Sequence, residues 1–333
     1  MLTGSLPPLT SAAALREWQF SPVVSAAVLV LAAGYLASSW RVARRHPARP
    51  WPASRTLAFL AGLAVIVVAT QSSIGAYDDV LVSVHMVQHV LLIMVAPPLL
   101  VLGRPVTLLM HAYGHPVHGW LKRAVRSRAA TALTWPPGIT AGYCAVVAGT
   151  HLTPMMSLAV RYPALHDAGH VLYLVTGYLF FLPVIGSEPI RWRVPAAGRL
   201  LMLLAVMPID TVTGVVLMLA QRGYLPTYPA AGRAWGPAPL ADLHDAGIVM
   251  WAGGDSIMTA LAVAMCVLVI HDPRRAGQLG GWVEGIRRAG LHERIAQAGL
   301  AIPPAGSVDD HAHLAAYNAT LEALEGDPDR RSG

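Results

Sequence analysis

The chain has 333 residues, of which 55% are hydrophobic and only 13% are charged. Because soluble globular proteins carry about a quarter charged residues, this composition excludes an ordinary soluble domain and indicates a polytopic membrane protein. The formal charge of +6 does not indicate a nucleic-acid-binding protein, since the basic residues lie in loops between apolar segments and form no basic face on a soluble domain.

Seven apolar segments are each long enough to form a spanning helix, for which about 20 residues are needed. They predict an all-α fold, a seven-helix transmembrane bundle over residues 22–270. The segments lie near 22–40, 56–74, 84–102, 139–158, 166–186, 200–220 and 245–270. Residues 1–21 would form an N-terminal segment outside the membrane, and residues 271–333 an amphipathic tail.

The basic residues predict an orientation. Of the 24 lysine and arginine residues, 20 lie in the loops and tail on one side of the predicted bundle and four on the other. Cytoplasmic loops of membrane proteins are enriched in lysine and arginine. We therefore expect the N-terminus outside and the C-terminus in the cytoplasm, in a bacterial plasma membrane.

Histidines gather at the predicted outer ends of four segments. The third and fifth segments each begin with two histidines spaced four residues apart, which places both rings on one helix face about 6 Å apart along the axis. The fourth segment carries a histidine near its outer end, and the seventh begins with one. With the methionine inside the first pair, the predicted metal ligands are His85, His89, His166, His170, Met86, His151 and His244.

Two acidic residues lie deeper in the predicted spans, Asp210 in the sixth and Asp255 in the seventh. A carboxylate near the bilayer centre is costly, so it usually faces the bundle interior and has a function. These two residues predict an ion or proton station. The alternative for any single polar residue is a hydrogen bond that holds two helices together. Two histidine pairs at equal depth favour metal ligation over that alternative.

Three kinds of chemistry use imidazoles in a membrane. Imidazole with thioether suits copper, especially Cu(I). Histidines from facing helices can also ligate haem iron axially, and a relay of His and Asp can carry protons. Methionines at the same outer level, Met86, Met155 and Met156, favour copper. A haem-binding or haem-handling membrane protein and a copper importer remain the alternatives.

Two segments carry a family resemblance. HMVQHVLLIMVAPPLLVLGRP, from His85 to Pro105, and HDAGHVLYLVTGYLFFLPVIGSEP, from His166 to Pro189, resemble hallmark segments of the CtaG-type cytochrome c oxidase assembly factors. The tail sequence AAYNATLEAL, residues 315–324, is a softer match. The similarity extends from about residue 20 to 325.

The resemblance implies a seven-span membrane protein without enzymatic activity that takes part in maturing a haem–copper oxidase of the caa type and helps to supply its copper. The positions of this chain that match the histidines of the family's segments are His85, His89, His166 and His170. The predicted partners are oxidase subunits or a copper chaperone, within the lipid bilayer and without nucleic acid.

Overall fold

The computed structural model describes residues 6–221 and 235–270, and within these residues every regular element is a helix. Met1–Ala264 form one compact unit and Met265–Gly333 a second, of which only the last residues of α15 are described. The predicted tail over residues 271–333 therefore lies outside the described residues. The all-α fold class is confirmed.

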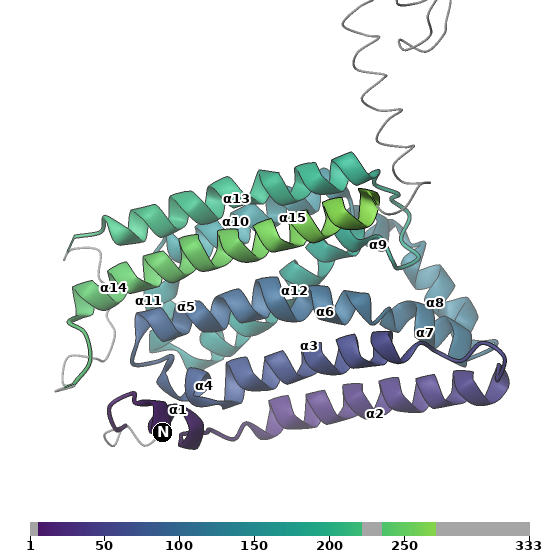
Figure 1. The fold of residues 1–333 in the computed structure, drawn as a ribbon, viewed down its shortest axis with the longest axis horizontal. Helices are drawn as coiled ribbons and strands as arrows, with labels where there is room; N and C mark the ends of the chain where they lie inside the picture. Colours follow the sequence, from purple (N-terminus) through teal and green to yellow (C-terminus); the bar gives the residue numbers. More distant parts are fainter. Residues whose placement is uncertain (1–5, 222–234, 271–333) are drawn as a thin grey trace, which may run out of the picture. The chain divides into compact units, whose positions relative to one another are not determined.

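Figure 1 shows the arrangement of the helices. In chain order they are α1 (Ser11–Arg16), α2 (Pro22–Arg45), α3 (Ala53–Gln71), α4 (Ser73–Tyr77), α5 (Val82–Val90), η1 (Leu91–Val95), α6 (Ala96–Leu102), α7 (Pro105–Ala112), α8 (Val117–Val125), α9 (Arg128–Leu133), α10 (Pro136–His151), α11 (Met155–Arg161), α12 (Pro163–Ile185), α13 (Ala196–Met218), α14 (Pro239–Ile248), η3 (Val249–Gly253) and α15 (Gly254–Ile270). The two η elements are π-helical turns.

Six stretches of the described chain are long and apolar enough to cross a membrane. They are Pro22–Arg45, Ala53–Tyr77, Val82–Ala112, Pro163–Ile185, Ala196–Met218 and Pro239–Leu268. Each coincides with one of the seven predicted segments. The remaining segment, near 139–158, falls on α10, which has only 16 residues and ends at His151, and on the short α11. The seven-helix count and the orientation of the termini stay predictions.

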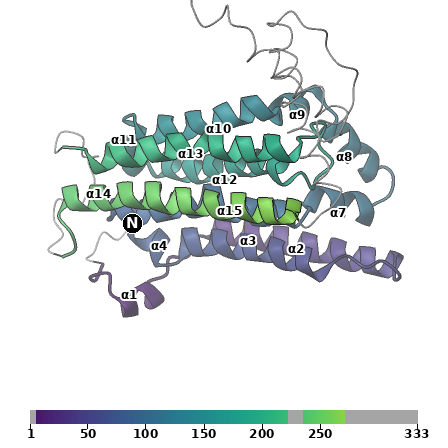
Figure 2. The same ribbon diagram turned by 45° about the horizontal axis from the view of Figure 1, so that its top comes forward.

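The long helices lie side by side, with α2 packed on α3, α3 on α6, α6 on α12, and α10 on α13 (Figures 1 and 2). The elements α4, α11 and α14 lie at one end of the bundle, and α7, α8 and α9 at the other. The first turns of α5 and α12 and the last turn of α10 share the α4 end. The histidine-bearing helix ends therefore lie at the same end of the bundle.

The third span contains a π-helical turn that the sequence pattern did not predict. Pro97 and Pro98 follow it in α6, and proline has no N–H to bond the carbonyl four residues earlier. The carbonyls of Ile93 and Met94 therefore lack their usual helical N–H partners. This favours the wider π-helical turn over Leu91–Val95, just before the two prolines. Gly177 of α12 packs against the Ile93 carbonyl so closely that a Cβ atom would overlap it. This contact brings the α12 backbone against the third span.

A buried carboxylate joins the two segments that carry the family resemblance. Arg104 adopts a left-handed conformation with φ 51° between α6 and α7, and α7 begins at the next residue. Glu188 then caps α7: its carboxylate accepts hydrogen bonds from the backbone N–H groups of Val106 and Thr107, both at 3.0 Å, and from the Thr107 hydroxyl at 2.6 Å. Burial raises the pKa of Glu188, and the Thr107 hydrogen bonds oppose that shift.

Candidate metal centre

The two predicted histidine pairs form one cluster of imidazole rings. On α5, the rings of His85 and His89 lie 4.2 Å apart between centroids, and on α12 those of His166 and His170 lie 4.4 Å apart. His85 and His166 join the helices, with centroids 5.1 Å apart. His85 is only 1% exposed and His89 7%. The i, i+4 spacing thus places both pairs on facing helix surfaces, with the rings turned toward each other.

Asp78, in the loop before α5, brings a carboxylate to this cluster. Its Oδ2 lies 3.8 Å from His166 Nε2, and the ligand atoms of Asp78, His166 and His170 all lie within 4.8 Å of one another. Burial, followed by the charge of Asp79, raises the pKa of Asp78 well above its usual range. A cation bound beside it would favour the ionised form. The cluster therefore offers one oxygen donor as well as nitrogen donors.

Gln88 connects the carboxylate to the second histidine pair. Its side-chain nitrogen donates to the Ala69 carbonyl at 3.0 Å and to Asp78 Oδ2 at 2.7 Å. Its Oε1 must then accept from His170 Nε2, 2.8 Å away. A neutral imidazole has one protonated nitrogen and one lone pair. Because Nε2 of His170 carries the proton, Nδ1 keeps the lone pair that a metal ion needs.

A hydrogen bond with His151 determines which ring nitrogen of His89 carries the proton. Nδ1 of His151 lies 2.9 Å from the Val147 carbonyl, which can only accept, so this nitrogen carries the proton. Nε2 of His151 is then an acceptor, and it receives a hydrogen bond from His89 Nδ1 at 3.2 Å. The lone pair of His89 is left on Nε2. His151, predicted as a ligand, has both ring nitrogens engaged here and is placed to orient a ligand.

Tyr173 of α12 supports the same ring. It stacks on His89 with centroids 4.2 Å apart and an interplanar angle of 23°. Its hydroxyl hydrogen-bonds with Thr150, and lies 3.4 Å from His151 Nδ1. Rotation of the His89 ring would break the stacking and the His151 hydrogen bond together, so its orientation is held from two sides.

The start of α5 is anchored from α14. The Asp242 carboxylate accepts hydrogen bonds from the N–H of Val82 at 2.7 Å, the N–H of Ser83 at 3.3 Å and the Ser83 hydroxyl at 2.6 Å. These N–H groups belong to the first turn of the helix and have no partner within it. Asp242 therefore fixes the helix that carries His85 and His89.

Two predicted ligands lie outside the ring cluster. Met86 is fully buried, but it lies on a different side of α5 from the two histidines, because neighbouring residues of a helix point about 100° apart. His244 of α14 hydrogen-bonds through Nε2 to the Ala220 carbonyl at 3.1 Å, and it makes none of the ring contacts found in the described part of the chain. The deep acids Asp210 and Asp255 lie in α13 and α15, which carry none of the four clustered histidines.

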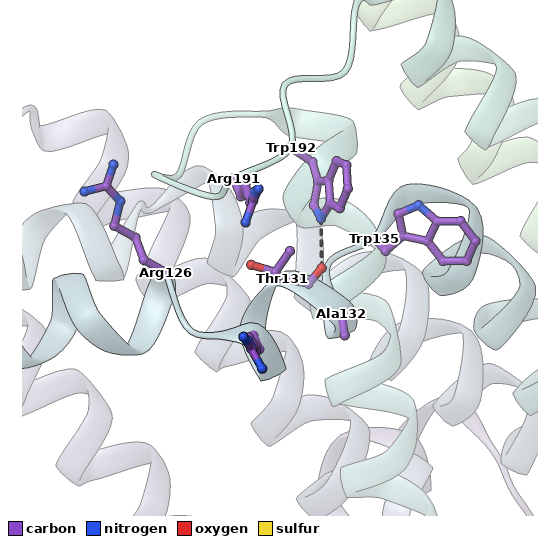
Figure 3. Close-up of a pocket in the computed structure, with 7 residues that line it drawn as sticks. Arg126, Thr131, Ala132, Trp135, Arg191 and Trp192 are labelled. Carbon is purple, nitrogen blue, oxygen red and sulfur yellow. Dashed lines mark hydrogen bonds between the residues drawn. The ribbon is translucent and has the colours of Figure 1, made fainter.

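A separate pocket of about 440 Å³ lies by α8 and α9, at the opposite end of the bundle (Figure 3). Its lining residues are Arg126, Arg128, Thr131, Ala132, Trp135, Arg191 and Trp192. The Trp192 indole N–H donates to the Thr131 carbonyl at 2.8 Å. Guanidinium groups are always charged donors and repel cations. This pocket therefore does not suit a metal ion.

Six apolar helical stretches in the described chain define a polytopic integral membrane protein, and its imidazole cluster is a candidate metal centre at one end of the bundle. Residues 33–272 match the family model of the cytochrome c oxidase caa3 assembly factor, and the chain belongs to that family.

Relatives of the chain are found in mycobacteria. Uncharacterized proteins of Mycobacterium bovis and Mycobacterium tuberculosis are each 34% identical over 328 residues, which covers 95% of this chain and 46% of the relative. An uncharacterized protein of Mycobacterium leprae is 30% identical over 256 residues, covering 74% of this chain and 38% of the relative. The chain thus spans less than half the length of these relatives. No solved structure matches it.

Proposed function

We propose that the protein is a copper-handling assembly factor that helps to metallate a haem–copper cytochrome c oxidase on the extracytoplasmic side of the membrane. The observation that carries this proposal is the cluster of four imidazoles, two of them buried, and one buried carboxylate at one end of the bundle. Membership of the caa3 assembly factor family supports the assembly role.

Copper suits the donor set better than haem. Imidazole nitrogen is a good ligand for copper in either oxidation state, and the Asp78 oxygen adds a donor that Cu(II) accepts readily. Axial ligation of haem by two histidines needs one imidazole on each face of the flat macrocycle. In this cluster the rings touch, with centroids 4.2 to 5.1 Å apart, which leaves no slot for a macrocycle between them.

The cluster also suits transfer better than permanent storage. His89 and His170 are the proposed principal ligands, because each has one nitrogen engaged by a neighbour and the other holding a lone pair. His85 and His166, each one turn nearer the start of its helix and 5.1 Å apart between ring centroids, are the proposed entry pair. Neutral imidazole ligands exchange without leaving a permanent buried charge. The receiving partner would be an oxidase subunit or a copper chaperone.

The proposed orientation places the histidine end outside the cytoplasm, with the N-terminus outside and the C-terminus inside a bacterial plasma membrane. The pocket lined by Arg126, Arg128 and Arg191 at the opposite end of the bundle supports this, because arginine is enriched on the cytoplasmic side.

The test is metal analysis of the purified protein carrying His89→Gln, His170→Gln or both. Each single change should lower the copper content, and the double change should nearly abolish it, with a loss smaller than the sum because both residues serve one site. His111→Gln is the matched control, since His111 is exposed and bonds only its own helix at the Thr107 carbonyl.

Glutamine keeps hydrogen-bonding capacity but is a poor copper ligand. Full copper content and normal cellular oxidase activity in the double variant would therefore leave helix packing as the role of these histidines. A Soret absorption band with stoichiometric haem would identify haem, and not copper, as the bound group. Copper uptake into proteoliposomes would identify an importer in place of a transfer factor.

A further inference from the structure

A second polar cluster lies in the interior of the bundle, on α13. Asp210 is 0% exposed, and neither of its carboxylate oxygens has a hydrogen-bond partner among the described residues. Thr213, one turn further along the same buried face, is also fully buried, and its hydroxyl likewise has no partner within the described chain. Buried polar groups nearly always have partners, so two on one helix face require an explanation.

Neighbouring helices add oxygen atoms to this face. Tyr143 of α10 is fully buried, its hydroxyl has no partner in the described residues, and it lies within electrostatic range of Asp210. Asp255 of α15 also lies within electrostatic range. Thr211 donates to Asp255 Oδ2 at 2.7 Å, whereas Asp255 Oδ1 has no partner among the residues described. A Cβ atom on Gly254 would lie 3.9 Å from Asp210 Cβ, so α15 passes close to the acid.

Two further titratable groups face Asp210, Cys144 of α10 and Tyr173 of α12, and neither carries a positive charge. No lysine, arginine or histidine of the described residues forms an ion pair with Asp210. An ionised carboxylate that is buried without a donor or a counter-ion is strongly disfavoured, and a second carboxylate nearby increases the cost. A carboxyl group used only for packing would hydrogen-bond to a neighbouring helix, which Asp210 does not do in the described structure.

We propose that Asp210, Asp255, Tyr143 and Thr213 form a proton-binding site in the membrane interior. Asp210 carries the exchangeable proton at neutral pH and is a neutral carboxylic acid in that state. Asp255 disfavours loss of the proton through like-charge repulsion. The Tyr143 and Thr213 hydroxyls can donate to the carboxylate when the proton leaves, which makes the exchange reversible. The site uses residues other than the histidine cluster, and Tyr173, which stacks on His89, lies within electrostatic range of Asp210.

The test is infrared spectroscopy of the purified full-length protein in detergent micelles at neutral pH. The wild type should show the carbonyl stretch of a protonated carboxylic acid. Because Asp78 and Glu188 also have raised pKa values, Asp210→Asn should remove only the contribution of Asp210, which the wild-type minus Asp210→Asn difference spectrum isolates. Asp255→Asn should leave the band in place but lower the pH at which it disappears. Asp245→Asn is the matched control and should leave the band unchanged, since Asp245 is exposed on α14.

Two results would overturn the proposal. If the wild-type minus Asp210→Asn difference spectrum contains only carboxylate bands, Asp210 is ionised and the site does not hold a proton. If the carboxylic-acid band is present in choline chloride but absent in sodium chloride, the occupant is a sodium ion. Asp210→Glu keeps a carboxylic acid at this position, so a wild-type minus Asp210→Glu difference spectrum without carboxylic-acid bands would refute the assignment even if Asp210→Asn does not fold. Copper analysis of the histidine variants is unaffected by either result.

Discussion

Asp242→Ala should destabilise the protein and release the first turn of α5. The change removes three hydrogen bonds, two of them from backbone N–H groups that have no other partner within the helix. Loss of a helix cap costs about 0.5–2 kcal/mol. Leaving the buried Val82 N–H without an acceptor costs about 1–3 kcal/mol. Since these contributions overlap, the total is less than their sum, and we expect a loss of about 1–3 kcal/mol in the free energy of unfolding.

The assay is thermal unfolding of the purified protein in micelles, combined with its copper content. Asp242→Asn keeps one side-chain acceptor and should lose roughly half as much stability as Asp242→Ala. Copper content should fall with stability, because His85 lies one turn from the capped end of α5. Asp245→Asn serves as the control on the same helix.

An Asp242→Ala protein with wild-type unfolding temperature and copper content would refute this reasoning, because the cap would then contribute nothing to the position of α5. Reduced stability with full copper content would separate the two roles. The cap would then stabilise the bundle without positioning the histidines.

Three further predictions follow from individual contacts. Gly177→Ala should cost about 1–3 kcal/mol by overpacking against the Ile93 carbonyl, measured by thermal unfolding, and unchanged stability would mean that α12 can move away from the third span. Burial raises the pKa of Glu188, so its contribution to stability should be lost as pH rises from the ordinary glutamate pKa through the raised value. As pH rises over that range, the unfolding temperature of Glu188→Gln should therefore increase relative to that of the wild type. A difference in unfolding temperature that does not change with pH would contradict the raised pKa of Glu188. His151→Leu should weaken copper binding about tenfold, because the His89 ring loses the hydrogen bond that orients it. The affinity is measured by competition with a chelator. An unchanged affinity would show that stacking on Tyr173 alone is sufficient to orient the His89 ring.

The amino-acid sequence was sufficient for the helical class and for the level of the histidines. Long apolar segments can satisfy their backbone hydrogen bonds in a membrane only as helices or closed barrels, and segments of about 20 residues favour helices. A spacing of four residues puts His85 with His89, and His166 with His170, on single helix faces whatever the tertiary structure. Successive spans run in alternate directions, so the predicted order of the spans indicated that these helix ends lie at the same end of the bundle. These inferences depend on local geometry alone.

The contacts that turn those histidines into a candidate site were decided by the tertiary structure. Gln88 lies on the same helix as the first pair, yet only packing shows that it bonds to His170, 82 residues away. Asp242 lies 160 residues from Val82, which it caps. Local sequence does not specify which ring nitrogen of His89 keeps its lone pair. That depends on His151 of another helix, whose own protonation is set by the Val147 carbonyl. Protonation and ligand geometry are properties of contacts between distant segments, and such contacts exist only once the helices have packed.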